Sequence, residues 1–274
     1  MKYREPNIVV ITGAASGIGR ALALSFTDAT LLLADRDEAG LADTARQCTG
    51  CHVDTEVLDI ADVEAVTGWA DRVVAEFGVP DEVHHVAGIS LWGDARSLPH
   101  DKWQKVIDIN LMGSIHMVEA FAHYLGDGHK PRRKLVFVSS AAGILGLPWH
   151  AAYSASKAGV MGMAEVLRFD MKPLGVDVHV VAPGAVDTPL VHSIDIHGVD
   201  RSNKRVQKAT ALFQGHAISP EDAAQAIRAG VRKNKYLITT SRDIAVARWA
   251  QVNCPWAYKA AMTLLNRGFA WARR

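Results

Sequence analysis

The sequence predicts an α/β fold, a doubly wound parallel sheet in three layers that forms a single domain with a helical C-terminal extension. Short apolar runs alternate with segments of helical period along most of the chain. The runs are apolar on both faces, as strands must be when helices cover both sides of their sheet. The chain has 274 residues, of which 49% are hydrophobic, so one large core can be buried.

Predicted strands are runs of β-branched and aliphatic residues, at 7–12, 30–35, 52–60, 82–88, 134–140, 177–183 and 236–240. Predicted helices lie between most of them, at 17–28, 37–47, 62–76, 101–125, 153–172 and 221–233. Asp62 stands where an N-cap is expected, and Ser219 precedes a proline at the first turn of the last of these helices. Because parallel neighbours need a crossover connection, this alternation indicates a parallel sheet.

We predict one domain over residues 1–241 and an amphipathic helical extension over residues 242–274. Residues 184–219 lack a clear pattern and are too long for an ordinary connection. They are interpreted as a substrate lid rather than a passive loop. The lid contains several apolar residues, namely Leu190, Val191, Ile194, Ile196, Val199, Leu212 and Phe213.

Charge and cysteine content narrow the classes of function. The formal net charge is +1, so the chain as a whole does not indicate nucleic-acid binding, although residues 201–274 hold 14 of the 30 Lys and Arg and only 3 of the 29 Asp and Glu. Cys48, Cys51 and Cys254 are interpreted as free thiols in a reducing compartment rather than as a redox or zinc pair. No metal site is expected. No signal segment or membrane span is recognised, so we predict a cytoplasmic protein.

A glycine-rich turn, "TGAASGIG" at residues 12–19, follows the first predicted strand and opens the first helix. Glycines there let the backbone turn sharply and approach a ligand closely, and the helix N-terminus presents free N–H groups to a pyrophosphate. The alternative is a merely tight turn. The context of strand before and helix after favours the dinucleotide site of a Rossmann fold. Its predicted cofactor contacts are Gly13, Ala15, Ser16, Gly17, Ile18 and Gly19.

Asp35 ends the second predicted strand, sixteen residues past Gly19. A carboxylate at this place can accept hydrogen bonds from both ribose hydroxyls of an adenosine and would repel a 2′-phosphate. Arg36 follows directly, and its side chain could stack on adenine or meet a 2′-phosphate. We therefore expect NAD as the cofactor, with NADP as the less favoured alternative.

A phenol and an ammonium stand one helical turn apart in "YSASK", at Tyr153 and Lys157. Positions i and i+4 of a helix face the same way, so the positive charge should lower the pKa of the phenol. A tyrosine poised in this way can take a proton from an alcohol or return it to a carbonyl. Ser140, at the end of its predicted strand, can hydrogen-bond the substrate oxygen. The alternative is an incidental pair on a solvated helix face.

These motifs together, T-G-x-x-x-G-x-G, Y-x-x-x-K and the serine thirteen residues before the tyrosine, resemble the short-chain dehydrogenase/reductase family. The resemblance covers residues 7 to about 240 and identifies residues 1–241 as a Rossmann-fold dehydrogenase domain. It implies NAD(P)-dependent interconversion of an alcohol and a carbonyl. It also implies that Tyr153 and Lys157 contact the cofactor, with the lysine on the nicotinamide ribose, and that the protein is a homodimer or homotetramer.

The same resemblance implies further site residues. Asn110 matches an asparagine that holds water in a proton relay to the lysine, and its alternative is a local bond that bends the helix. Asp59 matches an adenine-contacting aspartate with Ile60 against the ring, and its alternative is a helix cap. The resemblance implies close approach to the cofactor at Ala87 and Gly88, and contacts with the nicotinamide carboxamide from Pro183, Gly184, Val186 and Thr188.

One departure from the family pattern follows the fourth predicted strand. The family usually has Asn-Asn-Ala-Gly there, whereas this chain has His85 and Val86 before Ala87 and Gly88. The family asparagine braces neighbouring strands, and Val86 cannot. We expect the effect to fall on stability more than on chemistry. A metal role for His84 and His85 together is not expected, because adjacent strand residues point to opposite faces.

The extension at residues 242–274 reads as two helices separated by Pro255, with Trp249, Trp256 and Trp271 in a cationic segment. One interpretation is packing on the parent domain or on a neighbouring subunit. The other is peripheral contact with a membrane surface, for which such tryptophans and cations are suited. Nucleic-acid binding is the least favoured.

The sequence thus predicts an NAD(P)-dependent oxidoreductase that interconverts an alcohol and its ketone or aldehyde, with tyrosine as acid/base. The apolar lid, together with Ile144, Leu145, Leu147 and Trp149, favours a bulky hydrophobic small-molecule substrate such as a steroid, retinoid or lipid-derived alcohol. The alternatives are a non-catalytic nucleotide-sensing protein and a peripheral membrane protein on the same fold.

Overall fold

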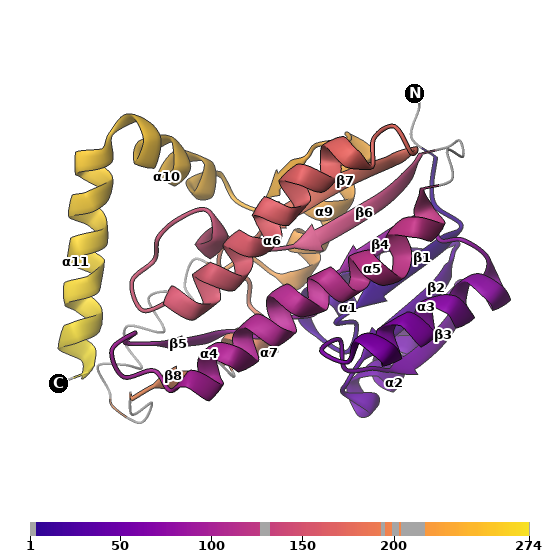
Figure 1. Ribbon diagram of the computed structural model, residues 1–274, viewed down its shortest axis with the longest axis horizontal. Coiled ribbons are helices and arrows are strands. Elements are labelled where there is room, and N and C mark those ends of the chain that lie inside the picture. Colours follow the sequence, from indigo (N-terminus) through magenta and orange to yellow (C-terminus); the bar gives the residue numbers. More distant parts are fainter. Residues whose placement is uncertain (1–3, 127–131, 193–194, 199–202, 204–216, 274) are drawn as a thin grey trace.

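The computed structural model describes residues 4–126, 132–192, 195–198, 203 and 217–273. Its centre is a seven-stranded sheet in the order β3-β2-β1-β4-β6-β7-β9, with every neighbouring pair parallel. All seven strands fall on predicted runs, and the predicted fold class is confirmed (Figure 1). The strands are β1 (Ile8–Thr12), β2 (Thr30–Asp35), β3 (His52–Val57), β4 (Glu82–His85), β6 (Arg133–Val138), β7 (Val176–Ala182) and β9 (Leu237–Thr239).

Helices cover both faces of this sheet and form the outer layers. One face carries α3 (Val63–Phe77), α5 (Gly113–Leu125) and α6 (Ala151–Asp170), whose side chains Trp69, Phe121 and Val160 share one core cluster. The other face carries α1 (Gly17–Leu24), α2 (Glu38–Gln47) and α9 (Pro220–Arg232), through Leu22, Leu41 and Ile227. A strand buried on both faces needs apolar side chains on both, which explains the continuous apolar runs.

Helix starts follow the predicted caps. The Asp62 side chain accepts a hydrogen bond from the Ala65 N–H at 3.0 Å and caps α3. The Ser219 hydroxyl accepts one from the Asp222 N–H at 3.0 Å and caps α9, whose first residue is Pro220. Each cap satisfies an N–H that has no partner inside the helix.

The chain order reverses between β1 and β4, which are neighbours in the sheet although β2 and β3 follow β1 in sequence. At such a switch point the connections leave in opposite directions and open a crevice beyond the carboxyl ends of the strands. The predicted long helix 101–125 divides here into α4 (His100–Ile107), a π-helical turn at Asp108–Met112 and α5. The turn places its bend beside the crevice, with Asn110 at its centre.

Several small elements were not predicted. A second, two-stranded parallel sheet pairs β5 (Leu91–Gly93) with β8 (Asp195–His197). A 3₁₀ turn, Ala141–Gly143, follows β6, and a four-residue helix, α7 (Pro189–His192), follows β7.

Most of the predicted lid, 184–219, lies outside the described residues, including Ile194, Val199, Leu212 and Phe213. Its two ends meet, because Asp187 N–H donates to the Ile218 carbonyl at 2.9 Å and Ile218 N–H donates to the Ala185 carbonyl at 3.1 Å. The two described ends of the segment therefore lie side by side, and the first of them follows β7.

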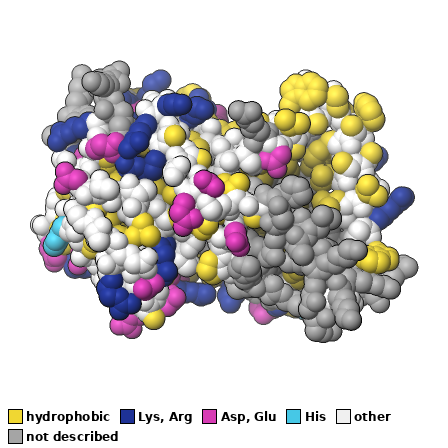
Figure 2. Space-filling model, turned by 180° about the vertical axis from the view of Figure 1, so that it is seen from behind, with side chains coloured by type: hydrophobic (Ala, Val, Ile, Leu, Met, Phe, Trp, Pro, Cys, Tyr) yellow, Lys and Arg dark blue, Asp and Glu magenta, His cyan; other side chains and the backbone are white. Residues whose placement is uncertain are grey.

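The C-terminal extension consists of α10 (Arg242–Asn253) and α11 (Pro255–Arg273), joined at Cys254. The two helices lie at one side of the molecule, and α11 runs along its outer edge (Figure 1). Apolar side chains gather on them in the space-filling view (Figure 2). In the described part of the chain, no helix has both the length and the apolar composition needed to cross a bilayer.

Candidate active site

The glycine-rich turn connects β1 to α1 beneath the loop that leaves β4. Gly13 has φ +73°, and a Cβ added to it would lie 2.7 Å from Ala87 N. A Cβ added to Gly19 would lie 2.0 Å from the Gly13 carbonyl oxygen. Only glycine fits either place, so the turn is closed tightly against Ala87. Ser16 is the N-cap of α1 and makes no side-chain cap hydrogen bond, which leaves the first N–H groups of the helix for a phosphate.

Asp35 ends β2 beside this turn. One carboxylate oxygen accepts a hydrogen bond from Ala15 N–H at 3.0 Å, and the other accepts one from Asp37 N–H at 3.1 Å. These bonds hold the carboxylate at the mouth of the turn, where the ribose of an adenosine dinucleotide lies in a Rossmann fold. Arg36 is exposed next to it.

Asp59 and Ile60 follow β3 at the same end of the sheet. Asp59 is exposed and accepts a hydrogen bond from Ala61 N–H at 2.9 Å, whereas α3 is capped by Asp62. The cap alternative for Asp59 is therefore wrong. Ile60 is buried against Gly113, and its carbonyl oxygen lies 2.9 Å from His116 Nδ1.

His85 takes over the bracing that Val86 cannot provide. His85 Nδ1 lies 2.8 Å from the Thr12 hydroxyl, which ends β1, and the same hydroxyl accepts a hydrogen bond from Val86 N–H at 3.2 Å. The side chain of β4 therefore ties this strand to β1 directly under the glycine-rich turn. Burial, with a smaller effect from the nearby positive charge of Lys157, lowers the pKa of His85 to about 3.

Three buried histidines make stability depend on pH. Burial lowers the pKa of His150 and of His179 to about 4 as well. In the unfolded chain these histidines bind protons near pH 6.5, whereas in the folded protein they stay neutral at that pH. Their contribution to the free energy of unfolding is therefore complete above pH 6.5 and is lost as pH falls toward 4. We expect about 1.4 kcal/mol of lost unfolding free energy per histidine and per pH unit over that window.

Urea denaturation at pH values between about 7.5 and 5 measures this loss. Replacing the exposed His100 by glutamine is the matched control and should leave the slope unchanged. An unfolding free energy that stays constant across the window would show that these histidines bind protons in the folded protein as readily as in the unfolded chain.

Tyr153 and Ser140 meet at the carboxyl end of the sheet. Tyr153 lies in the first turn of α6 and is 9% exposed, and its hydroxyl is hydrogen-bonded to the Ser140 side chain. Ser140 follows β6 by two residues and caps the 3₁₀ turn, where its hydroxyl accepts a hydrogen bond from Ala142 N–H at 3.1 Å. Two hydroxyls thus stand together at the place where a substrate oxygen would be held.

The pKa of Tyr153 differs from the sequence-based expectation. Burial raises it above its usual value of about 10, and the hydrogen bond with Ser140 offsets this only in part. The predicted lowering by Lys157 is therefore wrong for the protein without ligands. Burial disfavours the phenolate, and the spacing of the two residues in the sequence carries no information about burial.

Lys157 follows Tyr153 by one turn of α6 and is 4% exposed. Its ammonium group donates a hydrogen bond to the Val138 carbonyl at 3.0 Å, and burial lowers its pKa to about 8. A Cβ added to Gly88 would lie 3.1 Å from this ammonium nitrogen and 3.0 Å from Asn110 Oδ1. Gly88 therefore lets the lysine and the asparagine approach the same point of the crevice.

Asn110 sits in the π-helical turn and is fully buried. Its side chain accepts a hydrogen bond from Ile89 N–H at 2.8 Å and donates to the Ile89 carbonyl at 3.0 Å. It also donates to the Ser156 hydroxyl at 3.1 Å. The partners are far along the chain, so the alternative of a local bond that bends the helix is wrong. π-Helical turns often occur at functional sites.

The segment after β7 lies over the glycine-rich turn. A Cβ added to Gly17 would lie 3.0 Å from a methyl group of Thr188, and Gly184 N–H donates to the Thr240 hydroxyl at 3.2 Å. Val186 is buried and forms an isolated bridge with Ile218. The structure therefore brings Thr188 to the turn predicted to bind the pyrophosphate. The other residues predicted to meet the nicotinamide carboxamide, Pro183, Gly184 and Val186, precede Thr188 in the same segment after β7.

Sequence reasoning missed the contact between the C-terminal extension and the loop after Ser140. The Tyr258 hydroxyl, in α11, accepts a hydrogen bond from Gly146 N–H at 2.8 Å. The two residues are 112 positions apart, and only the fold reveals such a pair. Beside this loop, Trp92 of β5 stacks against His150 with ring centroids 4.1 Å apart.

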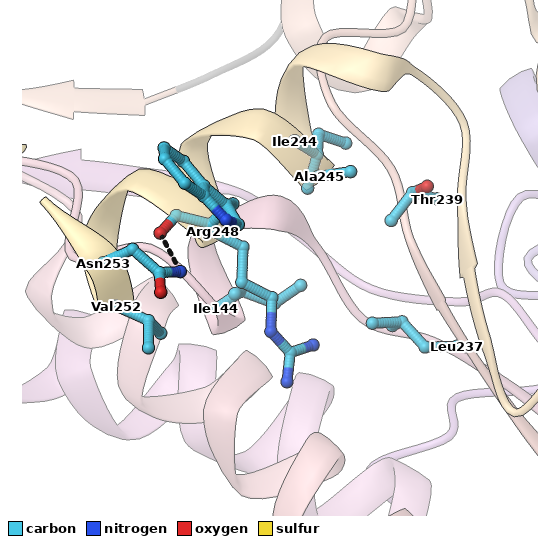
Figure 3. A pocket seen from close by; sticks show the side chains of 9 residues that line it. Ile144, Leu237, Thr239, Ile244, Ala245, Arg248, Val252 and Asn253 are labelled. Atoms are coloured by element: carbon cyan, nitrogen blue, oxygen red, sulfur yellow. Dashed lines mark hydrogen bonds between the residues drawn. The ribbon is translucent and has the colours of Figure 1, made fainter.

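A pocket of about 420 Å³ lies between that loop, β9 and α10 (Figure 3). It is lined by Ile144, Leu237, Thr239, Ile244, Ala245, Arg248, Trp249, Val252 and Asn253. None of the four candidate catalytic residues lines it, so it lies beside the catalytic crevice rather than in it. Its link to the crevice is Ile144, which ends the 3₁₀ turn that Ser140 begins.

Neither a metal-binding cluster nor a disulfide is present among the described residues. Among them, no three His, Cys, Asp or Glu side chains are grouped so as to hold a metal ion. Cys48, Cys51 and Cys254 are free thiols, as predicted, and burial raises the pKa of Cys48 to about 11.

Comparison with known proteins agrees with this geometry. Residues 7–197 match the family model of the short chain dehydrogenases. SadH of Mycobacterium tuberculosis, named as an oxidoreductase, is 36% identical over 247 residues, with 86% of each chain covered. The 1-deoxy-11-beta-hydroxypentalenate dehydrogenase of Streptomyces avermitilis is 30% identical over 268 residues, covering 94% of this chain and 93% of that protein.

A solved structure extends the likeness to three dimensions. The short-chain dehydrogenase/reductase of Burkholderia phymatum in complex with NAD has a TM-score of 0.80 and 26% identity, over 90% of this chain and 93% of that one. The chain therefore belongs to the short-chain dehydrogenase/reductase family, whose members are NAD(P)-dependent oxidoreductases that act on CH–OH donors.

Proposed function

We propose that the protein interconverts a bulky hydrophobic alcohol and its ketone or aldehyde, with Tyr153 as the acid/base. The observation that carries the proposal is the pair of hydroxyls formed by the buried Tyr153 and the half-buried Ser140, with Lys157 one turn along the same helix as the tyrosine. A nicotinamide dinucleotide bound at the glycine-rich turn would supply or accept the hydride. The remaining chemistry is the transfer of one proton and the orientation of one oxygen.

Ser140 donates a hydrogen bond to the substrate oxygen and holds it beside the Tyr153 hydroxyl. Tyr153 gives its proton to a carbonyl oxygen during reduction and takes one from an alcohol during oxidation. Because its pKa is raised, the phenol keeps its proton at neutral pH, and oxidation should speed up as pH rises. Lys157 holds the nicotinamide ribose, and Asn110 links the lysine to solvent through water.

The cofactor in this proposal is NAD rather than NADP. Asp35 stands at the mouth of the turn with a negative charge that attracts ribose hydroxyls and repels a 2′-phosphate. The fit rests on this carboxylate and on the first N–H groups of α1, which no side chain caps. Asp59 and Ile60 contact the adenine, and Arg36 is the residue through which NADP would bind if the preference were reversed.

Substitution of Asp35 by asparagine tests the cofactor preference. Asparagine keeps an oxygen for Ala15 N–H but removes the charge. We expect the ratio of kcat/KM with NAD to kcat/KM with NADP to fall by at least about tenfold, which corresponds to about 1.4 kcal/mol. Arg36→Ala is the paired variant and should leave the ratio high. A ratio unchanged in Asp35→Asn and raised in Arg36→Ala would assign the protein to NADP.

A hydrophobic substrate is supported by the side chains around the crevice. Ile144 and Leu145 follow Ser140, and the adjacent pocket is lined mainly by aliphatic and aromatic groups. A steroid, retinoid or lipid-derived alcohol suits these surroundings better than a sugar does. The experiment that tests the function measures the NADH formed from NAD when the protein is incubated with each of a series of hydrophobic and polar alcohols. Turnover of none of them would favour a non-catalytic nucleotide-sensing protein.

We also propose a homodimer or homotetramer in the cytoplasm. Exposed apolar side chains on α6 and at its end, Val166, Phe169 and Leu174, support association through α5 and α6. Free thiols suit a reducing compartment. Residues 1–241 are the dehydrogenase domain in this proposal, with 184–219 as its lid. Peripheral membrane contact through residues 242–274 depends on which side chains α10 and α11 leave exposed.

A further inference from the structure

Helices α10 and α11, residues 242–273, form an arm that touches the domain mainly along one side. Ile244 is 3% exposed and packs against Gly184, and Tyr258 is bonded to Gly146. The outer side of the arm faces away from the sheet and its helices (Figures 1 and 2). The arm is therefore anchored at its inner side and presents its outer side to the surroundings.

The outer side of α11 is apolar. Trp256 is 76% exposed, Leu264 71% and Trp271 56%. At about 100° per residue, these three side chains fall within an arc of about 80°, and Tyr258 points to the opposite side. Further exposed apolar side chains on α10 are Val246, Trp249 and Val252. The extension thus packs on the parent domain through Ile244 and Tyr258, as one interpretation of the sequence has it, but these apolar side chains take no part in that packing.

The same arm is cationic. After Asp243 the sequence has no acidic residue up to its end, whereas it has Arg248, Lys259, Arg267, Arg273 and Arg274. Lys259 and Arg267 are exposed and lie within about 60° of Trp256 around α11. By the same rotation Lys259 lies at the border of the apolar arc and Arg267 lies within it, and long cationic side chains can extend from either place to lipid head groups while the face enters the interface.

The charge decides between two possible occupants of this face. A second copy of the chain, paired through the same face, would bring one set of cations against an identical set, with Asp243 as the single acidic residue of each arm. An anionic bilayer offers the complementary charge, and its interfacial region is where tryptophan side chains concentrate.

We propose that the outer face of α11 docks on a bilayer with anionic head groups, with Trp256, Leu264 and Trp271 in the interfacial region and Lys259 and Arg267 at the head groups. The inference deepens the proposed function, because it names the phase from which a hydrophobic substrate comes. Docking itself requires neither cofactor nor turnover.

The anchor of the arm connects docking to the substrate side. Tyr258 binds the loop that follows Ser140, and α10 forms one wall of the pocket that Ile144 lines. Trp249 of α10 is exposed and also lines this pocket, so it offers an apolar path from the surroundings of the arm to the pocket beside the crevice. A docked protein holds this path near the lipid.

Co-sedimentation of the full chain with vesicles tests the proposal. We expect the protein to pellet with phosphatidylglycerol vesicles and to remain in solution with phosphatidylcholine vesicles. Lys259→Glu/Arg267→Glu should lower the partition coefficient by at least about tenfold, since each cation near the surface contributes about a factor of five. The matched control is Lys172→Glu/Lys233→Glu, two exposed cations outside the arm, which should leave partitioning within about twofold of wild type.

A second pair of substitutions, Trp256→Ser/Trp271→Ser, tests the apolar contribution and should also lower partitioning by at least about tenfold. Equal pelleting with both lipids, or arm variants that partition like wild type, would overturn the proposal. A third outcome would also overturn it: the wild type does not bind vesicles, and sedimentation velocity shows a lower oligomeric mass for the double tryptophan variant than for the wild type. The face would then be covered by a second copy of the chain. Turnover of a water-soluble alcohol, measured separately without vesicles, reports on the proposed function alone.

Discussion

Replacement of Tyr153 by phenylalanine should lower turnover by about 10²- to 10⁴-fold while dinucleotide affinity stays within about twofold of wild type. The hydroxyl lost is the one hydrogen-bonded to Ser140, and the ring that remains keeps the packing of a side chain that is 9% exposed. No other ionisable side chain with a suitable proton is bonded to Ser140 among the described residues. The loss should therefore appear in kcat and leave the folded structure intact.

Two measurements separate this loss from a structural defect. Isothermal titration with NAD measures cofactor binding, and the thermal midpoint measures folding. The pH dependence of oxidation in the wild type adds a third, because a raised tyrosine pKa predicts a rate that climbs with pH through the alkaline range. A phenylalanine variant that retains a substantial fraction of turnover would remove Tyr153 from its assigned role.

Replacement of Gly19 by alanine should abolish dinucleotide binding and destabilise the fold. The added methyl group would lie 2.0 Å from the Gly13 carbonyl oxygen and 3.2 Å from Ala14 Cα, and both of these atoms belong to the backbone of the binding turn. The turn must shift, and a displacement of about 1 Å at such a site can cost about 10²-fold in function. We expect unfolding free energy to fall by about 1–3 kcal/mol in addition.

The matched control for this variant is Gly68→Ala. Gly68 lies in α3, and a Cβ added there meets nothing within 4 Å. This substitution should leave NAD affinity unchanged and raise stability by about 0.5–1 kcal/mol, because alanine loses less backbone freedom in a helix. NAD titration and urea denaturation of both variants check the pair. Normal cofactor affinity in Gly19→Ala would move the dinucleotide away from this turn.

Periodicity predicts the large elements well because burial on a sheet or helix face determines it directly. β1, β2 and β7 are rich in aliphatic residues, and they begin and end within one residue of their predicted bounds. β5 and β8 escaped notice because each has three residues and pairs only with the other. The pairing between the two ends of residues 184–219 could not be predicted from sequence because it runs through backbone groups of Ala185, Asp187 and Ile218, which any residue type supplies.

Residue types and spacing predict the candidate site, but they do not give its electrostatics. The spacing of Tyr153 and Lys157 correctly indicates that they share a helix, but the direction of the tyrosine pKa depends on burial, which spacing does not contain. The strand brace by His85 depends on the register of β1 and β4, which pairs Thr12 with His85. The Tyr258 contact depends on where the last helix lies, and no local pattern specifies that.

A crystal structure of the protein with bound NAD and an alcohol analogue tests the central claim most directly. We expect the pyrophosphate to lie on the first turn of α1 and the Lys157 ammonium to reach the nicotinamide ribose. We also expect the hydroxyls of Tyr153 and Ser140 both to contact the analogue's oxygen beside the nicotinamide ring. A nicotinamide bound elsewhere, or an analogue oxygen held by other side chains with the Tyr153 hydroxyl turned away from it, would contradict the account.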